Sequence, residues 1–500
     1  MKAPYQALLE AHGEIALLSS IEDLLAWDNR TYMPKAAAAY RADQIAYLTG
    51  LTHGKRTDPR IGDLLAELNA KGIDPGDTSV EAVNLREWRR EYDRLVKLPT
   101  DLMEERSRIV IQAQEAWLTA RQDSDFSLFK PWLEKTIEIN IKIADCLGYE
   151  KEPYDALLDE YEPGAVTSEV AVVLNSLRDE LVPLIRAIGD ASRKPDTSIL
   201  KRDFPVQSQR EFAVEAAKAI GYSFDKGRLD ETAHPFCIDA GPEDTRITTH
   251  FEGHFFPKAF FSVMHEAGHG IYNQNLPGEH WGTPMGEYVS LGIHESQSRL
   301  WENLVGRNRA FWEYWYKRAQ KRFPALNDVS LDDFHFAINE VKPSLIRIEA
   351  DEVTYNLHIM LRFELERAML NGDLSAADVP AAWNEKVRSY LGVDVPDDSQ
   401  GCLQDIHWSG GMIGYFPTYT LGNLNAAQLY EKAAEEIGDL DAMFRAGEFT
   451  PLREWLTDKV HSQGKRYRSD KLIEVITGKP LDASSLVRYL RSKFGELYNL

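Results

Sequence analysis

Cysteine is scarce in this 500-residue sequence, which contains only Cys146, Cys237 and Cys402. Their spacing suggests neither a disulfide framework nor a thiolate zinc site, so we expect buried side chains in a reducing compartment. Long apolar runs are absent too: the N-terminus has no apolar signal core, and no run approaches the length of a membrane span. These absences predict a soluble, cytoplasmic protein without membrane partners.

Positive charge is also in short supply. The chain has 57 Lys and Arg residues against 79 Asp and Glu residues, a formal net charge of −22. Such a surface repels polyanions, which argues against nucleic acid and anionic membranes as partners. We find no internal repeat, low-complexity tract or flexible linker. A chain of this length can bury a large core, either as one domain or as two to three smaller ones.

Amphipathic helical periodicity covers most of the chain. It predicts helices near residues 4–29, 35–54, 80–122, 127–147, 166–192, 207–221, 331–340, 344–371, 424–437, 451–459 and 483–498. The exception is 244–251, where β-branched residues in rough alternation predict a strand. That strand could bind an extended peptide along its edge, or it could belong to a small structural hairpin. We expect a mainly α-helical fold with one small sheet.

The most informative motif is His265-Glu266-Ala-Gly-His269. Side chains four residues apart share one face of a helix, so both imidazoles can reach one metal ion. Glu266 falls on the neighbouring arc, where it can act on water at that metal. Pro257 and an apolar stripe at helical spacing support a helix over 258–272. The alternative for the histidines is a solvated helix face or hydrogen bonds in the core.

A catalytic zinc usually takes three protein ligands. After a turn-rich segment, a second helical stretch over 287–301 offers Glu287 and Glu295, with Glu302 just beyond it. We favour Glu295, because His294, Ser296 and Gln297 surround it with an unusually polar cluster. An isolated helix glutamate is otherwise expected to face solvent.

With these residues assembled, the chain resembles the carboxypeptidase Taq family of zinc metallocarboxypeptidases. The motifs that carry the resemblance occur in order from end to end: Trp27-Asp28, Met33-Pro34, Arg41 and Gln44; His234-Pro-Phe236; Asp244-Thr-Arg246-Ile-Thr248; His265-Glu266-Ala-Gly-His269; His294-Glu295-Ser-Gln297; Ile346-Arg347-Ile-Glu-Ala-Asp351; and Gly401-Cys-Leu-Gln404-Asp405-Ile-His407-Trp408. Such an ordered set is far more specific than one HExxH sequence.

The resemblance implies a mostly helical fold with a deep substrate groove and one sheet beside a zinc site, often as a homodimer. It implies a single metallocarboxypeptidase domain over 1–500, with 1–200 as a mainly helical groove wall and 201–500 carrying the zinc and substrate sites. It further implies release of single C-terminal residues from peptides with broad specificity. His265, His269 and Glu295 would hold Zn²⁺, for which Co²⁺ or Mn²⁺ could substitute, and Glu266 would be the general base.

Hydrolysis also needs a donor for the developing oxyanion, and an exopeptidase must recognise a free carboxylate. His407, Tyr415 and Tyr419 are the candidate donors, and the two tyrosines cannot be ranked. Arg347 is the candidate clamp, because a guanidinium can bind a carboxylate through two hydrogen bonds. On spacing alone, Arg347 would instead pair with Asp351 on an exposed helix.

Further roles are less constrained. Arg246 is a second candidate for substrate binding, and His234 joins it through its motif. Asp351 could orient a ligand histidine. The enzymatic alternative is a zinc oligopeptidase that cuts inside short peptides, which would tolerate an amidated C-terminus. The non-enzymatic alternative is a helical binding protein that holds no metal.

Overall fold

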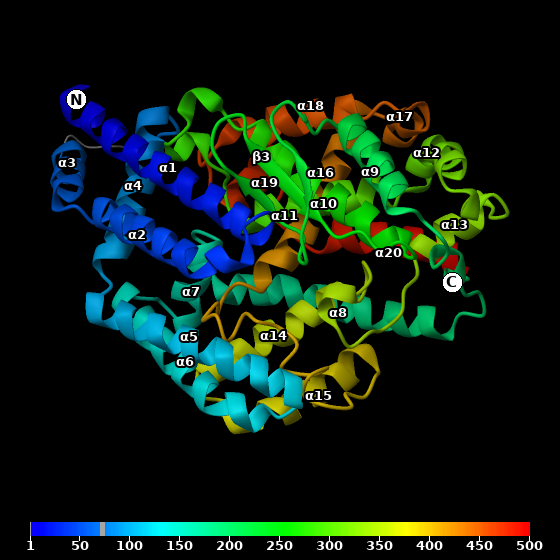
Figure 1. Ribbon diagram of the computed structural model, residues 1–500, viewed down its shortest axis with the longest axis horizontal. Coiled ribbons are helices and arrows are strands. Elements are labelled where there is room, and N and C mark those ends of the chain that lie inside the picture. Colours follow the sequence, from blue (N-terminus) through cyan, green and yellow to red (C-terminus); the bar gives the residue numbers. More distant parts are fainter. Residues whose placement is uncertain (1, 71–75) are drawn as a thin grey trace.

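The computed structural model describes residues 2–70 and 76–500 and is dominated by helices (Figure 1). The α-helices are α1 (Lys2–Arg30), α2 (Ala38–Arg56), α3 (Pro59–Asn69), α4 (Val80–Val96), α5 (Thr100–Asp123), α6 (Phe126–Leu147), α7 (Pro153–Tyr161), α8 (Thr167–Asp190), α9 (Val206–Ile220), α10 (Phe256–Gln274), α11 (Leu291–Arg299), α12 (Arg309–Arg322), α13 (Leu331–Ile338), α14 (Tyr355–Leu370), α15 (Val379–Leu391), α16 (Pro417–Ile437), α17 (Leu440–Ala446), α18 (Thr450–Lys459), α19 (Ser469–Thr477) and α20 (Ser484–Tyr498). The prediction of a mainly α fold is confirmed.

The small sheet has three strands, β1 (Leu229–Glu231), β2 (Cys237–Asp239) and β3 (Thr245–Thr249), in the order β1-β3-β2. β1 runs parallel to β3, and β2 runs antiparallel to it. The predicted strand is therefore present as β3, but it is the central strand, and both of its edges are already paired. β2 is the outer strand next to α1 and α10, so any peptide added to the sheet on this side would pair with β2.

Two large apolar cores build the molecule. One unites α5–α8 with α14, α15 and α20, and the other unites α9–α13 with α17–α19 and the sheet. A smaller cluster joins α1, α3 and α4. α16 lies at the seam, because Leu421 and Leu424 belong to the first core while Ala426 and Leu429 belong to the second.

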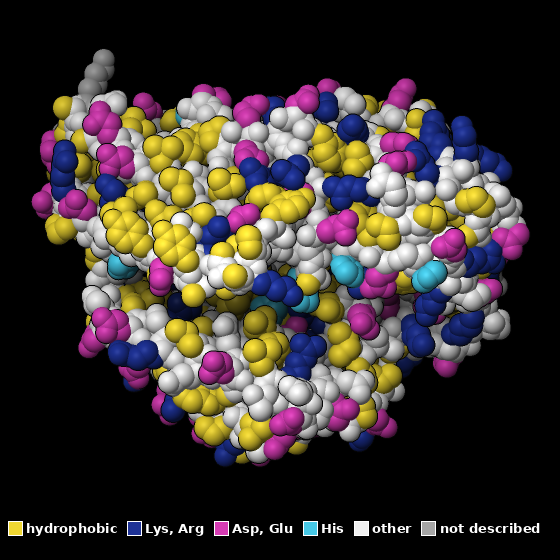
Figure 2. Space-filling view, in the orientation of Figure 1, with side chains coloured by type: hydrophobic (Ala, Val, Ile, Leu, Met, Phe, Trp, Pro, Cys, Tyr) yellow, Lys and Arg dark blue, Asp and Glu magenta, His cyan; other side chains and the backbone are white. Residues whose placement is uncertain are grey.

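The seam is visible from outside as a hollow. Figure 2 shows it running across one face, between the upper and lower halves of the view, with histidine side chains along it. Among the described residues, no helix combines the length and apolar character that crossing a lipid bilayer would require.

Three predicted helices have different bounds in the structure. The helix predicted over 80–122 is broken into α4 and α5 before Thr100, where Pro99 cannot donate an intrahelical hydrogen bond. The one predicted over 344–371 begins only at Tyr355, because Asp351 accepts hydrogen bonds from the backbone N–H groups of Val353 and Thr354, as a residue at a helix start does. α16 begins at Pro417, seven residues earlier than predicted, so it also includes Tyr419.

Candidate metal centre

α10 carries the HExxH motif at the seam between the two cores. Pro257 occupies its first turn, where a missing N–H costs nothing, and Phe260, Met264 and Ile271 are buried in the second core. The opposite side of the helix turns His265 and His269 toward α11. The helix predicted from the motif is confirmed, with both imidazoles on one face.

α11 supplies the third donor from the facing direction. Glu295 Oε2 lies 3.6 Å from His265 Nε2 and 3.3 Å from His269 Nε2. One ligand atom from each of the three residues falls within 4.8 Å of the others. Two imidazole nitrogens and one carboxylate oxygen converging in this way fit the donor set of a catalytic zinc site. Glu287 does not take part, because it pairs with Lys465.

The far nitrogens of both imidazoles have partners of their own. His265 Nδ1 lies 2.9 Å from Glu302 Oε2. An ionised carboxylate can only accept, so Nδ1 carries the proton and donates it, which leaves the Nε2 lone pair free for a metal. We predicted Asp351 as a possible orienting carboxylate; the structure gives that contact to Glu302.

His269 is oriented through a second histidine. His294 Nε2 lies 2.9 Å from Asn273 Oδ1, and His294 Nδ1 lies 2.5 Å from His269 Nδ1. Burial lowers the pKa of His294 well below its usual value, so this ring is neutral. If Nε2 of His294 donates to the amide oxygen, its Nδ1 must accept from His269, which again leaves His269 Nε2 free.

Two glycines allow the helices to come this close. A Cβ at Gly268 would lie 2.5 Å from the backbone oxygen of Gln297 on α11. A Cβ at Gly422 on α16 would lie 2.5 Å from Cγ of Glu295. α10 and α16 therefore press against α11 at positions where no side chain would fit, and the third ligand is confined between them.

The two carboxyl groups of the centre, Glu295 and Glu266, have pKa values shifted in opposite directions. Burial raises the pKa of Glu295 as well, but the neighbouring Arg299 and the two imidazoles outweigh it and hold the pKa well below its usual range. Glu266 is only 6% exposed, and burial raises the pKa of its carboxyl group. One carboxylate is therefore held charged, as a metal ligand has to be, while burial makes the other a better proton acceptor.

Arg347 reaches the seam from the other core, in a short 3₁₀ turn, Arg347–Glu349, and not in the helix predicted there. It does not form the pair with Asp351 that spacing alone offered as the alternative. Its Nε and Nη2 donate to Oδ1 of Asp405 at 3.0 and 2.8 Å, and its Nη1 donates to the Tyr355 hydroxyl at 3.2 Å. Arg362 binds the second oxygen of the same carboxylate. Two buried guanidinium groups thus share a single carboxylate.

The candidate oxyanion donors gather beside Arg347. His407 Nε2 lies 3.3 Å from the Tyr419 hydroxyl, and the rings of Tyr415 and Tyr419 have centroids 5.3 Å apart. Burial lowers the pKa of His407 to about 4, so the ring is neutral near pH 7. Burial, with the charge of Glu295 adding to it, raises the pKa of Tyr415 to about 12, so its hydroxyl keeps its proton. The structure brings all three predicted side chains together.

The other two predicted substrate residues lie apart from this group. Arg246 on β3 makes two hydrogen bonds to Asp244, at 2.8 and 2.6 Å, and stacks over Trp27. His234 is exposed in the loop before β2. In the described part of the chain, neither shares a hydrogen bond or ion pair with the metal triad.

Four residues beside the site were not predicted to belong to it, or were given a lesser role: Arg299, Glu302, Tyr355 and Arg362. Glu302 had one available signal, since it lies seven residues after Glu295 and therefore on the same helix face. Arg362 had none, because its partner Asp405 lies 43 positions further on. Tyr355 had none either, because its contact with Arg347 depends on the turn between them and not on helical spacing.

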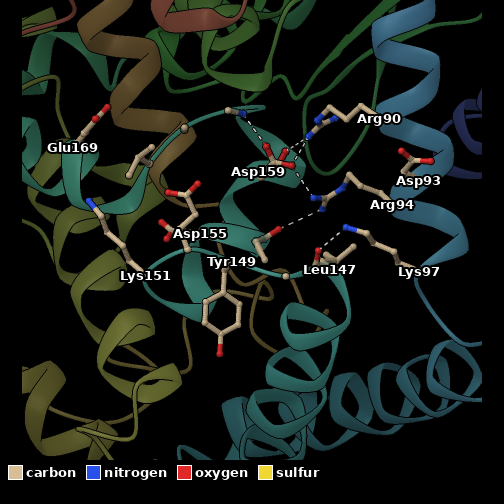
Figure 3. Close-up of a pocket in the computed structure, with 16 residues that line it drawn as sticks. Arg90, Asp93, Arg94, Lys97, Leu147, Tyr149, Lys151, Asp155, Asp159 and Glu169 are labelled. Atoms are coloured by element: carbon tan, nitrogen blue, oxygen red, sulfur yellow. Dashed lines mark hydrogen bonds and ion pairs between the residues drawn. The ribbon is translucent and has the colours of Figure 1, made fainter. Parts of the chain in front are cut away.

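A second cavity, of about 550 Å³, lies away from the metal centre between α4 and α7 (Figure 3). Its basic side chains are already engaged: Arg90 and Arg94 bind Asp159, and Lys97 donates to the backbone oxygen of Leu147. The two arginines are thus held by a carboxylate within the cavity wall.

Comparison with known proteins agrees with the motifs. The family model described as carboxypeptidase Taq (M32) metallopeptidase matches residues 7–494. Thermostable carboxypeptidase 1 of Thermus thermophilus is 47% identical over 506 residues, covering 99% of each chain. Carboxypeptidase 1 of Bacillus subtilis is 41% identical over 478 residues, covering 95% of each chain.

Solved structures give the same result. The crystal structure of the M32 carboxypeptidase from Deinococcus radiodurans R1 superposes with a TM-score of 0.96 at 39% identity over 100% of both chains. The resemblance inferred from the ordered motifs is confirmed. The protein is a peptide hydrolase of the metallocarboxypeptidase type, and the chain belongs to the carboxypeptidase Taq (M32) family.

Proposed function

We propose that this chain is a zinc enzyme in which His265, His269 and Glu295 bind the metal and Glu266 is the general base. The convergence of the three donor atoms and the orientation of both imidazoles by their Nδ1 partners support this ligand set. Nitrogen and oxygen donors of this kind also accept Co²⁺ or Mn²⁺, which we propose as functional substitutes.

A zinc ion held there would supply a Lewis acid that polarises the scissile carbonyl and makes a water molecule more acidic. Glu266 takes a proton from the attacking water and later returns it to the leaving amine. Burial raises the pKa of its carboxyl group, which makes it a better proton acceptor than a free glutamate. His407, Tyr415 and Tyr419 offer hydrogen-bond donors beside the site, and such donors stabilise the charge that develops on the carbonyl oxygen.

The main support for exopeptidase activity is the unbalanced positive charge around Asp405. Arg347 and Arg362 are both buried, and one carboxylate cannot neutralise two guanidinium groups. A guanidinium has five N–H groups, and three of those on Arg347 are used. We propose that the free C-terminal carboxylate of a peptide binds the remaining donors of Arg347 and supplies the missing negative charge.

Burial and the charge of Glu295 raise the pKa of both tyrosine hydroxyl groups, Tyr415 and Tyr419. Tyr419 lies beside the clamp, since the guanidinium of Arg347 is 5.1 Å from its ring centroid and His407 Nε2 is 3.3 Å from its hydroxyl. We propose that His407, Tyr415 and Tyr419 together form the donor set for the developing oxyanion, with Tyr419 on the side of Arg347. Arg246 and His234 would contact the substrate further from the cleaved bond.

The decisive test compares one blocked peptide bearing a free C-terminus with its C-terminally amidated twin, with zinc or cobalt and with a chelator. We expect single residues to be released only from the free acid and only with metal. Arg347→Met should lower kcat/KM for the free acid roughly 100-fold or more, chiefly by raising KM. Arg367→Met, on α14 but paired with Glu152, is the matched control. Internal cleavage of both peptides would instead identify an oligopeptidase.

We also propose a homodimer formed through the outer face of α1 and α2. These helices lie side by side, and hydrophobic side chains gather over them (Figures 1 and 2). The exposed apolar residues are Leu17, Ile21, Leu24, Tyr32, Tyr40, Tyr47 and Leu51. Exposed apolar side chains gathered on one face are typical of a protein–protein interface. A second copy of the same face would cover it.

Two further predictions from the sequence remain proposals. We propose one catalytic domain, with 1–200 as groove wall and 201–500 carrying the metal and substrate sites; in support, one core packs α5–α8 against α14, α15 and α20 from the C-terminal part. We also propose a cytoplasmic location, in keeping with three free cysteines.

A further inference from the structure

Arg299 and Glu302 connect two of the three proposed metal ligands to each other. Arg299 Nε donates to Glu295 Oε1 at 2.7 Å, and its Nη1 donates to Glu302 Oε2 at 3.1 Å. The same Glu302 oxygen accepts from His265 Nδ1 at 2.9 Å. A continuous chain of hydrogen bonds therefore runs from one ligand, through a buried ion pair, to the next.

Each contact determines which ligand atom is presented. With Oε1 of Glu295 held by Arg299, Oε2 is the oxygen that faces the imidazoles. With Nδ1 of His265 held by Glu302, Nε2 is the nitrogen that faces the same point. Both ligands are thereby limited to one donor atom in one direction, which removes rotamers that a metal would otherwise have to select.

The backbone and the surroundings hold the pair itself in place. Glu302 lies in a π-helical turn, Leu300–Val305, directly after α11, and such turns are rare and frequent at functional sites. The Arg299 guanidinium is 4.5 Å from the Tyr355 ring centroid, and Arg307 lies 3.7 Å from the other Glu302 oxygen. Arg299 and Glu302 side chains are only 15% and 13% exposed.

We propose that Arg299 and Glu302 act as one positioning unit for the metal, so that metal affinity depends on the pair although neither residue is a ligand. The inference rests on the proposed ligand set. It predicts a loss of metal affinity, which a merely structural ion pair would not cause, and it predicts that the two residues are not independent.

The test measures zinc affinity of the full-length protein by competition with a chelator, for Arg299→Met, Glu302→Gln and the double variant. We expect each single variant to bind zinc roughly 10- to 100-fold more weakly. The double variant should lose little more than either single one, because breaking either link disables the unit. Cobalt absorption spectra of the variants should also change, reporting altered ligand geometry.

The matched control is Glu313→Gln, which removes an ion pair with Arg309 at helical spacing on α12, away from the metal. It should leave zinc affinity unchanged. Unchanged zinc affinity in Arg299→Met and Glu302→Gln, or fully additive losses in the double variant, would overturn the inference. The conservative variant Arg299→Lys should bind zinc more tightly than Arg299→Met. Lysine keeps the positive charge, although it lacks the two-donor geometry of a guanidinium.

A wrong ligand set would give a different result from a wrong positioning unit. His269→Ala and Glu295→Gln should abolish tight zinc binding if that set is right. If these two variants keep zinc, the proposed ligands are wrong. If they lose zinc while the Arg299 and Glu302 variants keep it, only the positioning unit is wrong.

Discussion

Glu266 lies beside the two proposed ligand histidines, and within the described chain no side chain or backbone group donates a hydrogen bond to its carboxylate. Burial raises the pKa of its carboxyl group, the two imidazoles oppose this, and the negative charges of Glu295 and Glu302 add to it. A carboxylate that has no structural partner at a metal face is available for proton transfer.

We therefore expect Glu266→Gln to reduce kcat roughly 100- to 10,000-fold while zinc stays bound, because the amide cannot take a proton from water. The measurement is kcat together with zinc content per chain. Glu279→Gln, an exposed position after α10, serves as control. Loss of zinc along with activity would mean that Glu266 has a structural or ligand role instead.

The residue scale also shows which site contacts were predictable. His265, Glu266 and His269 follow from spacing within one helix, and Glu295 from a polar cluster on the next. Arg347 was predicted as a site residue, but its partner was not. The i,i+4 rule suggested Asp351, whereas the structure pairs it with Asp405, 58 positions further on. A local rule cannot see a partner that only the packing of two distant segments brings within reach.

At the scale of elements, the contact between α10 and α11 sets the separation of the ligands. Gly268→Ala would place a Cβ 2.5 Å from the Gln297 oxygen and 2.7 Å from Ser298 Cα. Backbone atoms cannot rotate away as a side chain can, so the helices must separate.

We expect Gly268→Ala to lower the free energy of unfolding by about 1–3 kcal/mol and to weaken zinc binding through the displaced Glu295. Chemical unfolding and chelator competition measure the two effects. Gly278→Ala, where a Cβ meets open space, is the control. An unchanged zinc affinity in Gly268→Ala would show that the site tolerates separation of the helices.

Glu366 on α14 joins three segments of the first core. It accepts hydrogen bonds from Tyr154 on α7, from Trp408 next to His407, and from the backbone N–H of Gly414 next to Tyr415. Burial raises the pKa of Glu366 to about 7. Because the pKa of Glu366 is higher in the folded state than in the unfolded state, the folded protein binds this proton more tightly.

The stability contributed by that proton is present below a pH of about 4.5 and is lost as pH rises toward about 7. We expect Glu366→Gln to flatten the fall in unfolding free energy over this range, measured by chemical unfolding at several pH values. Glu364→Gln, on the same helix but in a partly exposed ion pair with Arg178, should keep the parent slope. Parallel pH curves for Glu366→Gln and the parent would contradict the assignment.

Helix boundaries illustrate what periodicity misses. Residues 344–354 have a pattern that continues into α14, yet Asp351 binds backbone N–H groups and starts the helix later. Pro99 likewise interrupts a pattern that reads as continuous over 80–122. Asp351 takes backbone hydrogen bonds in place of the helix, whereas Pro99 lacks the N–H group that a continuous helix needs. Amphipathic periodicity records neither effect.

At the scale of the whole molecule, the apolar face of α1 and α2 predicts assembly. Tyr40 and Tyr47 are 70% and 73% exposed, one above the other on α2. We expect the double variant Tyr40→Ser, Tyr47→Ser to shift the protein from dimer to monomer, measured by light scattering after size-exclusion chromatography.

The control is the double variant Ile111→Ser, Leu118→Ser, which removes two exposed side chains at the same spacing on α5. It should leave the molar mass unchanged. A dimer that persists in the α2 variant but not in the α5 variant would place the interface on the lower half of the molecule instead.

The sequence by itself determined the helical class, the helix that carries the HExxH motif, the candidate metal ligands and the family, because these depend on short-range spacing and on motifs that need no partner. Tertiary structure decided the rest: the pairing of Arg347 with Asp405, the contact of Glu302 with His265, and the close approach of α10, α11 and α16. Those features depend on which surfaces pack together. Which surfaces pack together depends on the burial of the two apolar cores and on the charged side chains buried between them. No local sequence pattern encodes either.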